Sequence, residues 1–367
     1  MALVRQSTLS KAYPMNGGNG LYSYRRNSAY QGKAIDSTKK LIDDSIAKDL
    51  HIEELSSNIF AVADMGCSVG PNTFSVIQNI VEAVERKCQY RGLGSGFLEF
   101  QIFLNDHAFN DFNTLFRSLP ADRKYYAAGV PGSFHGRLFH DNSLHIVTSS
   151  YALQWLSQVP QEVVEKSSAW NKGMVHYMNS SDQTIEVYSN QFAKDMESFL
   201  CARAQEIMGG GLVMLIVPGR ETGCLLSQVC GIMTYNLLGS CLMDMVRKGI
   251  LSEEKVDSFN IPVYFASPPE LELAVERNGC FSIEKMECLV QEKTQLSVHE
   301  KSKIVSFATR AGLEILLEEH FGQEIMDELF ESLAERLENS PFFDVGDVYN
   351  LFVLLKRKPK DQKKVQT

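Results

Sequence analysis

A short glycine-containing segment, residues 64–72 (DMGCSVGPN), follows an apolar run and could form a ligand-binding turn. Gly66 and Gly70 permit a tight turn with close approach of a ligand, and a helix that starts after the turn offers unpaired N–H groups. The segment lacks the third glycine of a dinucleotide fingerprint and the Gly-Lys-Ser/Thr ending of a phosphate-binding loop. Asp64 ends the apolar run, and a carboxylate there suits a cationic amino-acid group better than a pyrophosphate. A plain turn is the alternative.

A second acidic residue, Asp106, ends the next apolar run. In dinucleotide-binding folds an acid at this point accepts two hydrogen bonds from a ribose diol. A nucleoside without a phosphate needs this acid and does not need a phosphate-binding lysine. Asp64, Gly66 and Asp106 together therefore favour a cofactor of the S-adenosylmethionine type. Alternatively, Asp106 could be a cap or turn residue before Asn110 and Asp111.

Two later loops carry side chains that suit the rest of such a pocket. The Ser133 hydroxyl and the Phe134 ring follow the third apolar run, where they could flank an adenine. After the fourth run, helical spacing would place Tyr151, Gln154 and Trp155 on one face. A phenol, an amide and an indole N–H on one face predict a pocket wall, whereas a tyrosine and a tryptophan alone would fit a core.

The elements that must position these residues can be read from hydrophobic spacing. Seven apolar runs predict strands at residues 59–66, 98–104, 125–129, 143–149, 212–217, 281–286 and 349–356. Helical spacing intervenes, for example over residues 73–87, so we expect an α/β fold with a parallel or mostly parallel sheet. Residues 222–275 and 290–340 show helical spacing without strand signals. We expect them to cap the carboxyl edge of the sheet, where open α/β sheets bind ligands.

The composition is that of an ordinary globular protein, with 44% hydrophobic and 22% charged residues among 367. The net charge is −9 and the basic residues gather only in a C-terminal tail over residues 356–364, which argues against a nucleic-acid partner. The sequence has no signal-peptide run and no apolar stretch near the ~18 residues of a membrane helix, so we expect a cytoplasmic protein without a membrane partner. The eight cysteines are scattered without metal-ligand spacing, which predicts reduced thiols.

These motifs together resemble the plant SABATH methyltransferases. That family transfers a methyl group from S-adenosylmethionine to small carboxylic acids, and one branch N-methylates xanthines. The matching segments are residues 15–18, 23–24, 27–31, 64–72, 104–106, 110–113, 130–134, 155–160, 202–206, 257–262 and 320–322, so the resemblance covers nearly the whole chain. The resemblance implies a Rossmann-like class I methyltransferase sheet with a helical cap.

We expect the chain to divide into three parts. An N-terminal active-site segment covers residues 1–35. The methyltransferase core combines residues 36–221, 276–289 and 341–367, and the helical cap combines residues 222–275 and 290–340. Because relatives are commonly homodimers, we also expect a homodimer.

The resemblance implies roles for individual residues. The positions that match cofactor-binding residues are Tyr24, Ser28, Asp64, Cys67, Asn72, Asp106, His107, Ser133 and Phe134. Gln31 and Trp155 match the catalytic pair that hydrogen-bonds the substrate carboxylate. The other substrate-binding positions are Tyr24, Tyr151, Gln154, Tyr235 and Thr309. Some relatives are described with a magnesium site, and its positions match Asn171, Asp257, Phe259 and Asn260, although a structural turn is the alternative there.

This residue set suits the transfer of a methyl group to a carboxylate. A carboxylate is already ionised at neutral pH, since its unperturbed pKa is about 4, so no general base or covalent nucleophile is needed. The rate should come from alignment of the oxygen with the methyl group and from exclusion of water. Neutral donors such as Gln31 and Trp155 orient a carboxylate without quenching its nucleophilicity, as an arginine would.

The expected substrate pocket departs from the salicylate-type pattern of the family. Gln154 and Thr309 stand where methionines often clamp the ring, and Tyr235 replaces a tryptophan. These polar groups favour an acid with a polar substituent, and residues 242–250 and 257–262 look most like the loganate-methylating members. An N-methyltransferase acting on a xanthine-like ring is the alternative, against which Gln31 argues because a xanthine offers no carboxylate. A cofactor-binding protein without catalysis is a third class.

Overall fold

The computed structural model describes residues 13–52, 57–94, 96–164, 167–289, 295–344 and 349–359, so the end of the basic tail lies outside the described residues. All seven predicted strands are present. They are β1 (Ile59–Met65), β2 (Glu99–Asp106), β3 (Tyr125–Pro131), β4 (Leu144–Ser150), β5 (Ile207–Pro218), β6 (Phe281–Leu289) and β7 (Asn350–Arg357). The helices are α1 (Tyr24–Asn27), α2 (Ala29–Ser37), α3 (Lys39–Asp49), α4 (Asn72–Tyr90), α5 (Phe112–Arg117), α6 (Asp182–Glu206), α7 (Cys230–Arg247), α8 (Glu253–Asp257), α9 (Pro268–Asn278), α10 (Val298–Phe321) and α11 (Met326–Glu338).

The strands of the described ranges form one seven-stranded sheet in the order β3-β2-β1-β4-β5-β7-β6. The five strands from β3 to β5 are parallel, and β7 runs antiparallel to both of its neighbours. The prediction of a mostly parallel sheet is therefore confirmed. The strand order reverses between β1 and β4, and this switch point is where open α/β sheets bind ligands beyond the carboxyl ends of the strands.

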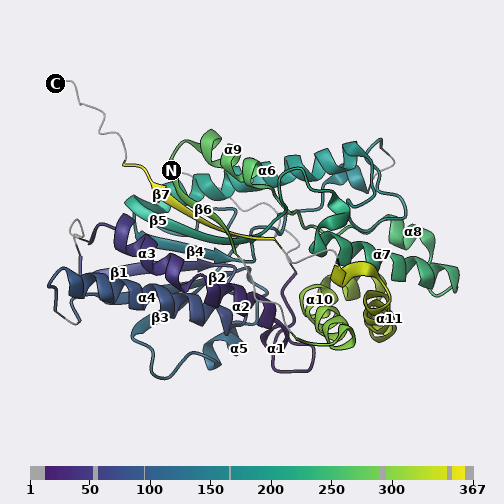
Figure 1. Cartoon of the computed structure of the whole chain (residues 1–367), viewed down its shortest axis with the longest axis horizontal. Coiled ribbons are helices and arrows are strands. Elements are labelled where there is room, and N and C mark those ends of the chain that lie inside the picture. Colours follow the sequence, from purple (N-terminus) through teal and green to yellow (C-terminus); the bar gives the residue numbers. More distant parts are fainter. Residues whose placement is uncertain are drawn as a thin grey trace.

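Helices cover both faces of the sheet (Figure 1). Side chains of β5 alternate between two hydrophobic clusters: Leu212, Met214 and Ile216 join the cluster that includes α3 and α4. Val213 and Leu215 join the cluster that includes α6 and the cap helices. Because successive side chains of a strand point to opposite faces, a run that is apolar throughout forms a strand buried on both sides.

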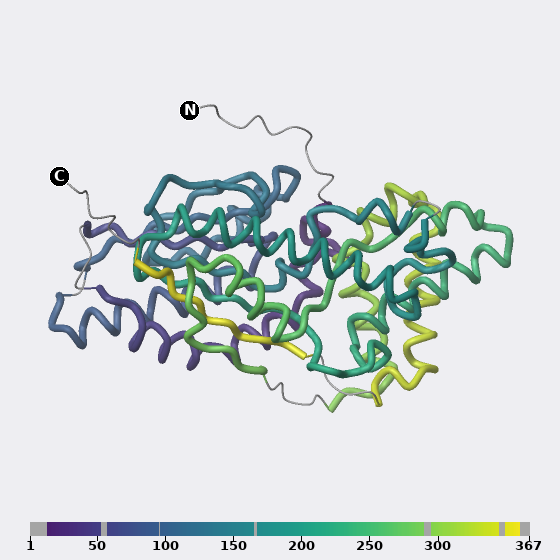
Figure 2. The backbone as a smooth tube through the Cα atoms, turned by 90° about the horizontal axis from the view of Figure 1, so that it is seen from above, coloured from purple at the N-terminus to yellow at the C-terminus, as the bar shows by residue number. Residues whose placement is uncertain are grey.

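The helices α7, α8, α10 and α11 lie together at one end of the molecule, and the sheet lies at the other end (Figures 1 and 2). Within this group α10 packs on α11, which packs on α7. The helix α9 instead packs on α6 and β6, which argues for a cap boundary near residue 267 rather than 275. The division into three parts stays a prediction.

The N-terminal segment runs along the cap, where α1 contacts α10. The Asn16 N–H donates to the Ala311 carbonyl at 2.9 Å, and the Tyr22 ring meets Phe307 edge-on at 5.3 Å. The segment therefore joins α10 to the core helices that follow it in the chain. None of the helices in the described ranges has the length and hydrophobicity that crossing a bilayer requires.

Candidate active site

Asp64 lies in β1 with 3% of its surface exposed. Its Oδ2 accepts a hydrogen bond from the Thr73 hydroxyl at 2.5 Å, whereas its Oδ1 is buried and has no partner among the described residues. Burial raises the pKa of Asp64 to about 7, and the negative charge of Asp106 adds to this effect, while the Thr73 hydrogen bond opposes it. A buried carboxylate oxygen without a partner is costly, so this atom is a candidate ligand for a cationic group.

The predicted turn after β1 is closely packed. Gly66 has a φ of +82°, and a Cβ there would lie 2.3 Å from the Ala152 Cβ and 3.7 Å from the Phe134 ring. Only glycine fits this position, which brings the turn against the loop after β4. The N–H groups of Gly66 and Cys67 both donate to the Asn105 carbonyl at 2.9 Å, and burial raises the pKa of the Cys67 thiol well above its usual range.

Asp106 lies at the carboxyl end of β2, beside the same turn. Its Oδ2 accepts from the Ser68 N–H at 2.7 Å and its Oδ1 from the His107 N–H at 2.8 Å. Burial raises the pKa of Asp106, and the neighbouring His107 opposes this. The helix cap that follows is Asp111, whose side chain accepts from the Thr114 N–H, so the capping role considered for Asp106 belongs to Asp111. Each of these carboxylate oxygens accepts one hydrogen bond from the protein and can accept another, so the pair can still bind the two hydroxyls of a ribose diol.

The N-terminal segment contacts the start of α4. Asn72, at the start of α4, donates its amide N–H to the Ser28 carbonyl at 3.2 Å. Burial, and after it the charge of Asp106, raise the pKa of the Tyr24 phenol. The structure thus brings Ser28 to the start of α4, which follows the turn after β1.

The loop that carries Ser133 and Phe134 is fastened to β2. The Asn105 amide donates to the Val130 and Gly132 carbonyls at 2.7 and 2.9 Å, and the Gly132 N–H donates to the Asp106 carbonyl at 2.9 Å. The Ser133 hydroxyl accepts from the His135 N–H at 3.3 Å. Since the Phe134 ring also lies beside Gly66, this loop borders the turn after β1.

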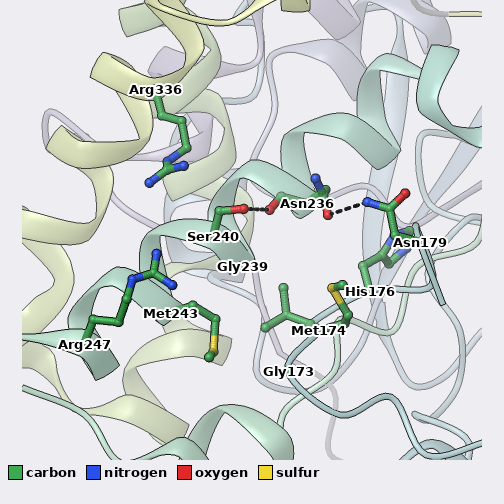
Figure 3. Close-up of a pocket in the computed structure, with 11 residues that line it drawn as sticks. Gly173, Met174, His176, Asn179, Asn236, Gly239, Ser240, Met243, Arg247 and Arg336 are labelled. Carbon is green, nitrogen blue, oxygen red and sulfur yellow. Dashed lines mark hydrogen bonds between the residues drawn. The ribbon is translucent and has the colours of Figure 1, made fainter. Parts of the chain in front are cut away.

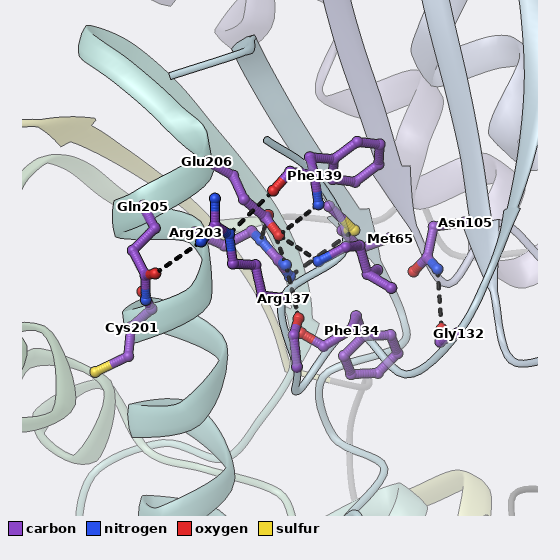
Figure 4. A network of polar contacts seen from close by, with 12 residues as sticks. Met65, Asn105, Gly132, Phe134, Arg137, Phe139, Cys201, Arg203, Gln205 and Glu206 are labelled. Carbon is purple, nitrogen blue, oxygen red and sulfur yellow. Dashed lines mark hydrogen bonds and ion pairs between the residues drawn. The ribbon is translucent and has the colours of Figure 1, made fainter. Parts of the chain in front are cut away.

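An ion pair buried at the end of α6 supports the same loop (Figure 4). Arg203 and Glu206 are fully buried and contact each other at 2.7 Å. The Arg203 guanidinium donates to the Phe134 and Gly136 carbonyls at 2.8 and 3.0 Å, and Glu206 accepts from the N–H groups of Leu138 and Phe139. Sequence reasoning missed this role, because nothing in the spacing of α6 indicates which loop its last turn contacts.

The helix predicted around Trp155 is wrong. Tyr151 has a φ of +56°, and the chain leaves β4 through this turn. The Trp155 backbone then forms a bridge with Val263, and the Gln154 carbonyl accepts from the Tyr264 N–H at 2.9 Å. This pairing with a segment about a hundred residues away replaces the local hydrogen bonds of a helix.

The residues predicted to donate hydrogen bonds to the substrate lie in this loop, Gln154 and Trp155, and in α2, Gln31. The Gln154 amide donates to the Tyr151 carbonyl at 2.7 Å, and its buried Oε1 has no partner among the described residues. The Gln31 Oε1 is likewise buried, and the structure describes no partner for it. Trp155 is partly buried against the hydrophobic cluster that contains the cap.

Two further pocket residues were predicted on the cap. Tyr235 lies on α7, and its ring meets the His176 ring edge-on at 5.0 Å. The Thr309 hydroxyl of α10 donates to the Val305 carbonyl at 2.7 Å, so only its lone pairs remain for a ligand. Sequence reasoning gave no role to His176. Its Nε2 lies 2.9 Å from the Val263 carbonyl and therefore carries the proton, while burial lowers the pKa of His176 to about 3 and keeps the ring neutral.

Three of the four residues matched to a magnesium site have side chains that are already hydrogen-bonded within the protein. The Asn171 amide donates to the Asn260 Oδ1 at 2.6 Å, and its own Oδ1 accepts from the Ser180 hydroxyl. Asp257 accepts from the Gly173 N–H at 2.7 Å. Magnesium prefers free carboxylate oxygens, and the described residues contain no group of three His, Cys, Asp or Glu side chains that could hold a metal. With Phe259 buried in the hydrophobic cluster, the set does not fit a magnesium ion.

A cavity of about 330 Å³ lies between residues 173–179, α7 and α11 (Figure 3). Arg247 and Arg336 contribute positive charge to it, but both pair with the carboxylate of Asp244. This single carboxylate offsets one of the two positive charges. None of the residues expected to bind cofactor or substrate lines this cavity.

Comparison with known proteins agrees with this arrangement. The model of the family described as SAM dependent carboxyl methyltransferase matches residues 10–358. Loganic acid O-methyltransferase of Catharanthus roseus is 45% identical over 360 residues, which are 96% of this chain and 96% of that protein. Caffeine synthase 1 of Camellia crassicolumna is 36% identical over 351 residues, which are 91% of this chain and 93% of that protein.

A solved structure of loganic acid methyltransferase with SAH has a TM-score of 0.91 to this chain at 43% identity, and the match covers 95% of this chain and 100% of that one. This similarity confirms the predicted class I methyltransferase sheet with helices. The chain therefore belongs to the family of SAM-dependent carboxyl methyltransferases, the SABATH family that its motifs resemble.

Proposed function

We propose that the protein binds S-adenosylmethionine at the carboxyl ends of β1 and β2 and transfers its methyl group to the carboxylate of a small-molecule acid. The observation that most supports this proposal is the pair of buried acids there, Asp64 and Asp106. The Asp64 Oδ1 has no partner among the described residues. Gly66 lets the turn after β1 pack against Phe134 and Ala152 beside these acids. When bound, the cofactor supplies an activated methyl group on a sulfonium.

In this proposal each residue near the acids binds one part of the cofactor. Asp64 pairs with the α-ammonium group, and Asp106 accepts the ribose diol, with His107 on the adenine side. The Phe134 ring lies against the adenine, and the Ser133 hydroxyl hydrogen-bonds its edge. Other contacts come from Tyr24, Ser28, Cys67 and Asn72. The Cys67 thiol stays protonated, since burial raises its pKa, and so remains a neutral contact.

The carboxylate of the acid is held by Gln31 and Trp155, which donate hydrogen bonds and carry no charge. An ionised carboxylate needs no base, so these residues contribute by fixing the attacking oxygen in line with the methyl group. The Gln31 amide Nε2 would donate this bond, whereas its Oε1 is buried and has no partner among the described residues. Tyr24 and Tyr151 border the same carboxylate.

The predicted acid carries a polar substituent, which contacts Gln154, Tyr235 and Thr309. The support is the free Oε1 of Gln154, and the relative that is 45% identical is by its name a methyltransferase of loganic acid. N-methylation of a xanthine-type ring is the second candidate, supported by a caffeine synthase at 36% identity. Gln31 discriminates, because a xanthine gives it no carboxylate to hold.

Variants of the two donors test the proposal. Gln31→Ala and Trp155→Phe should each lower kcat/KM for the preferred acid, by up to ~100-fold if the oxygen moves by about 1 Å, with little change in the Kd of S-adenosylmethionine. Gln158→Ala is the matched control, because Gln158 is exposed in the same loop as Trp155. If both donor variants turn over at the wild-type rate, the carboxylate assignment fails.

We also propose that the enzyme is a homodimer, as the family resemblance implies, and that it lies in the cytoplasm. Light scattering coupled to size-exclusion chromatography gives the mass of the assembly, and a fluorescent fusion gives the compartment. No step of the proposed reaction uses magnesium, because Asn171 and Asn260 are hydrogen-bonded to each other and Asp257 accepts from the Gly173 N–H.

A further inference from the structure

Asn350, the first residue of β7, is completely buried and joins two parts of the candidate site. Its amide Nδ2 donates to the Tyr30 hydroxyl at 2.7 Å. Its Oδ1 accepts from the Tyr151 hydroxyl at 2.9 Å. The two tyrosine rings meet edge-on with centroids 6.4 Å apart, so one amide and two rings form a single cluster.

Each tyrosine is directly connected to one of the two proposed carboxylate donors. Tyr30 precedes Gln31 in α2, which belongs to the N-terminal segment. Tyr151 begins the turn that leads to Trp155, and the Gln154 amide closes this turn by donating to the Tyr151 carbonyl. Asn350 therefore lies between the segment that carries Gln31 and the loop that carries Trp155.

The Tyr151 backbone shows that this turn needs external support. Its φ of +56° lies in the left-handed region, which bulky side chains rarely adopt and which the surrounding structure must stabilise. The Tyr151 N–H donates to the Ile216 carbonyl at 2.9 Å, and Asn350 fixes the other end of the residue, the phenol. Backbone and side chain of Tyr151 are thus both held by strands of the sheet, β5 and β7.

We infer that Asn350 is a positioning residue for methyl transfer: it sets the separation of Gln31 and Trp155 by binding the Tyr30 and Tyr151 hydroxyls. This inference rests on the proposed function of those two donors. An amide suits the position, because it donates to one phenol and accepts from the other, whereas a leucine of similar volume would do neither. Asn350 acts on the reaction through these two tyrosines.

The variants Tyr30→Phe and Asn350→Leu test the inference. Tyr30→Phe removes only the hydroxyl that accepts from the Asn350 amide and keeps the aromatic ring. We therefore expect this variant to fold even if Asn350→Leu does not. We expect kcat to fall by ~10-fold or more, while the Kd of S-adenosylmethionine measured by calorimetry stays unchanged, since misplacement by about 1 Å can cost ~100-fold. Tyr90→Phe is the matched control, because the Tyr90 side chain is 90% exposed at the far end of α4.

A double-variant cycle separates positioning from general stability. If Tyr30 acts through Gln31, then Tyr30→Phe has little further effect on kcat in a Gln31→Ala background, whereas a general loss of stability would lower kcat equally in both backgrounds. Equal effects in the two backgrounds, or wild-type kcat in folded Tyr30→Phe, would overturn the inference. In either case a low kcat of Gln31→Ala would leave the proposed function intact, while wild-type turnover of Gln31→Ala would contradict the proposed function itself.

Discussion

Binding of S-adenosylmethionine should weaken as the pH falls below 7, because Asp64 must be ionised to pair with the α-ammonium group. Burial raises the pKa of Asp64 to about 7 in the free protein, so the carboxyl is protonated and neutral at lower pH. The ammonium group keeps its charge over this range, since its ordinary pKa is about 7.7–8. Binding at low pH must therefore release the proton of Asp64, and the affinity decreases with the ionised fraction of this carboxyl.

The magnitude follows from that pKa. About half of the Asp64 carboxyls are ionised at pH 7 and about 3% at pH 5.5, so the Kd should rise by about 15-fold, or ~1.6 kcal/mol, between these values. Isothermal titration calorimetry at both pH values measures the change. Repeating the titration in buffers of different ionisation enthalpy counts the released proton, which should approach one per site at pH 5.5.

Two variants assign the effect to Asp64. Asp64→Asn should bind more weakly at pH 7 and lose most of the pH dependence. Thr73→Val removes a hydrogen bond that lowers the pKa of Asp64, so it should move the midpoint of the dependence to higher pH. A wild-type Kd that is constant from pH 5.5 to 7 in folded protein would refute the reasoning, and a pH dependence that survives in Asp64→Asn would transfer the role to another acid.

Further outcomes follow from the same geometry. Asp106→Ala should raise the Kd of S-adenosylmethionine by ~10- to 100-fold, because hydrogen bonds to charged groups contribute ~1.5–3 kcal/mol; an unchanged Kd by calorimetry removes Asp106 from the site. Glu206→Gln leaves the buried Arg203 without its ion pair and should lower the free energy of unfolding in urea by ~3 kcal/mol and weaken cofactor binding, unlike Glu197→Gln on the exposed face of α6. The triple variant Gln154→Met, Tyr235→Trp, Thr309→Met should raise the ratio of kcat/KM for benzoate to that for the best polar acid, since unpaired buried groups cost ~1–3 kcal/mol each. A ratio that does not rise means that these three residues do not set specificity.

Hydrophobic periodicity predicted the sheet most clearly at β1, β4 and β7, which are buried along nearly their whole length, and burial on both faces leaves such runs few alternatives. The clearest boundary error is β5, which begins at Ile207 rather than 212. Residues 207–211 include three glycines and carry little strand signal, yet Ile207 pairs with Leu144 of the neighbouring strand. A tertiary pairing of this kind is not visible in a window of local sequence.

The candidate site was predicted where motifs lie at strand ends, as with Asp64 and Asp106, because parallel strands bring their carboxyl ends to one edge of the sheet. Contacts between distant segments were not predicted. The turn at Tyr151 is set by Val263 and Asn350, and the loop of Phe134 is held by Arg203. These contacts are made by polar or backbone groups that follow no periodic pattern in the sequence, so only the folded chain reveals them.

The most direct test of the central claim is the identity of the methylated product. The protein is incubated with S-adenosylmethionine labelled in the methyl group and with a panel of small carboxylic acids, with and without polar substituents, together with xanthines. Mass spectrometry and mild alkaline hydrolysis then show whether the label lies in an ester. We expect a labelled methyl ester, formed fastest on an acid with a polar substituent. Alkaline hydrolysis of this ester should release the label as methanol. Label that appears only on a xanthine nitrogen and resists alkali would contradict this expectation.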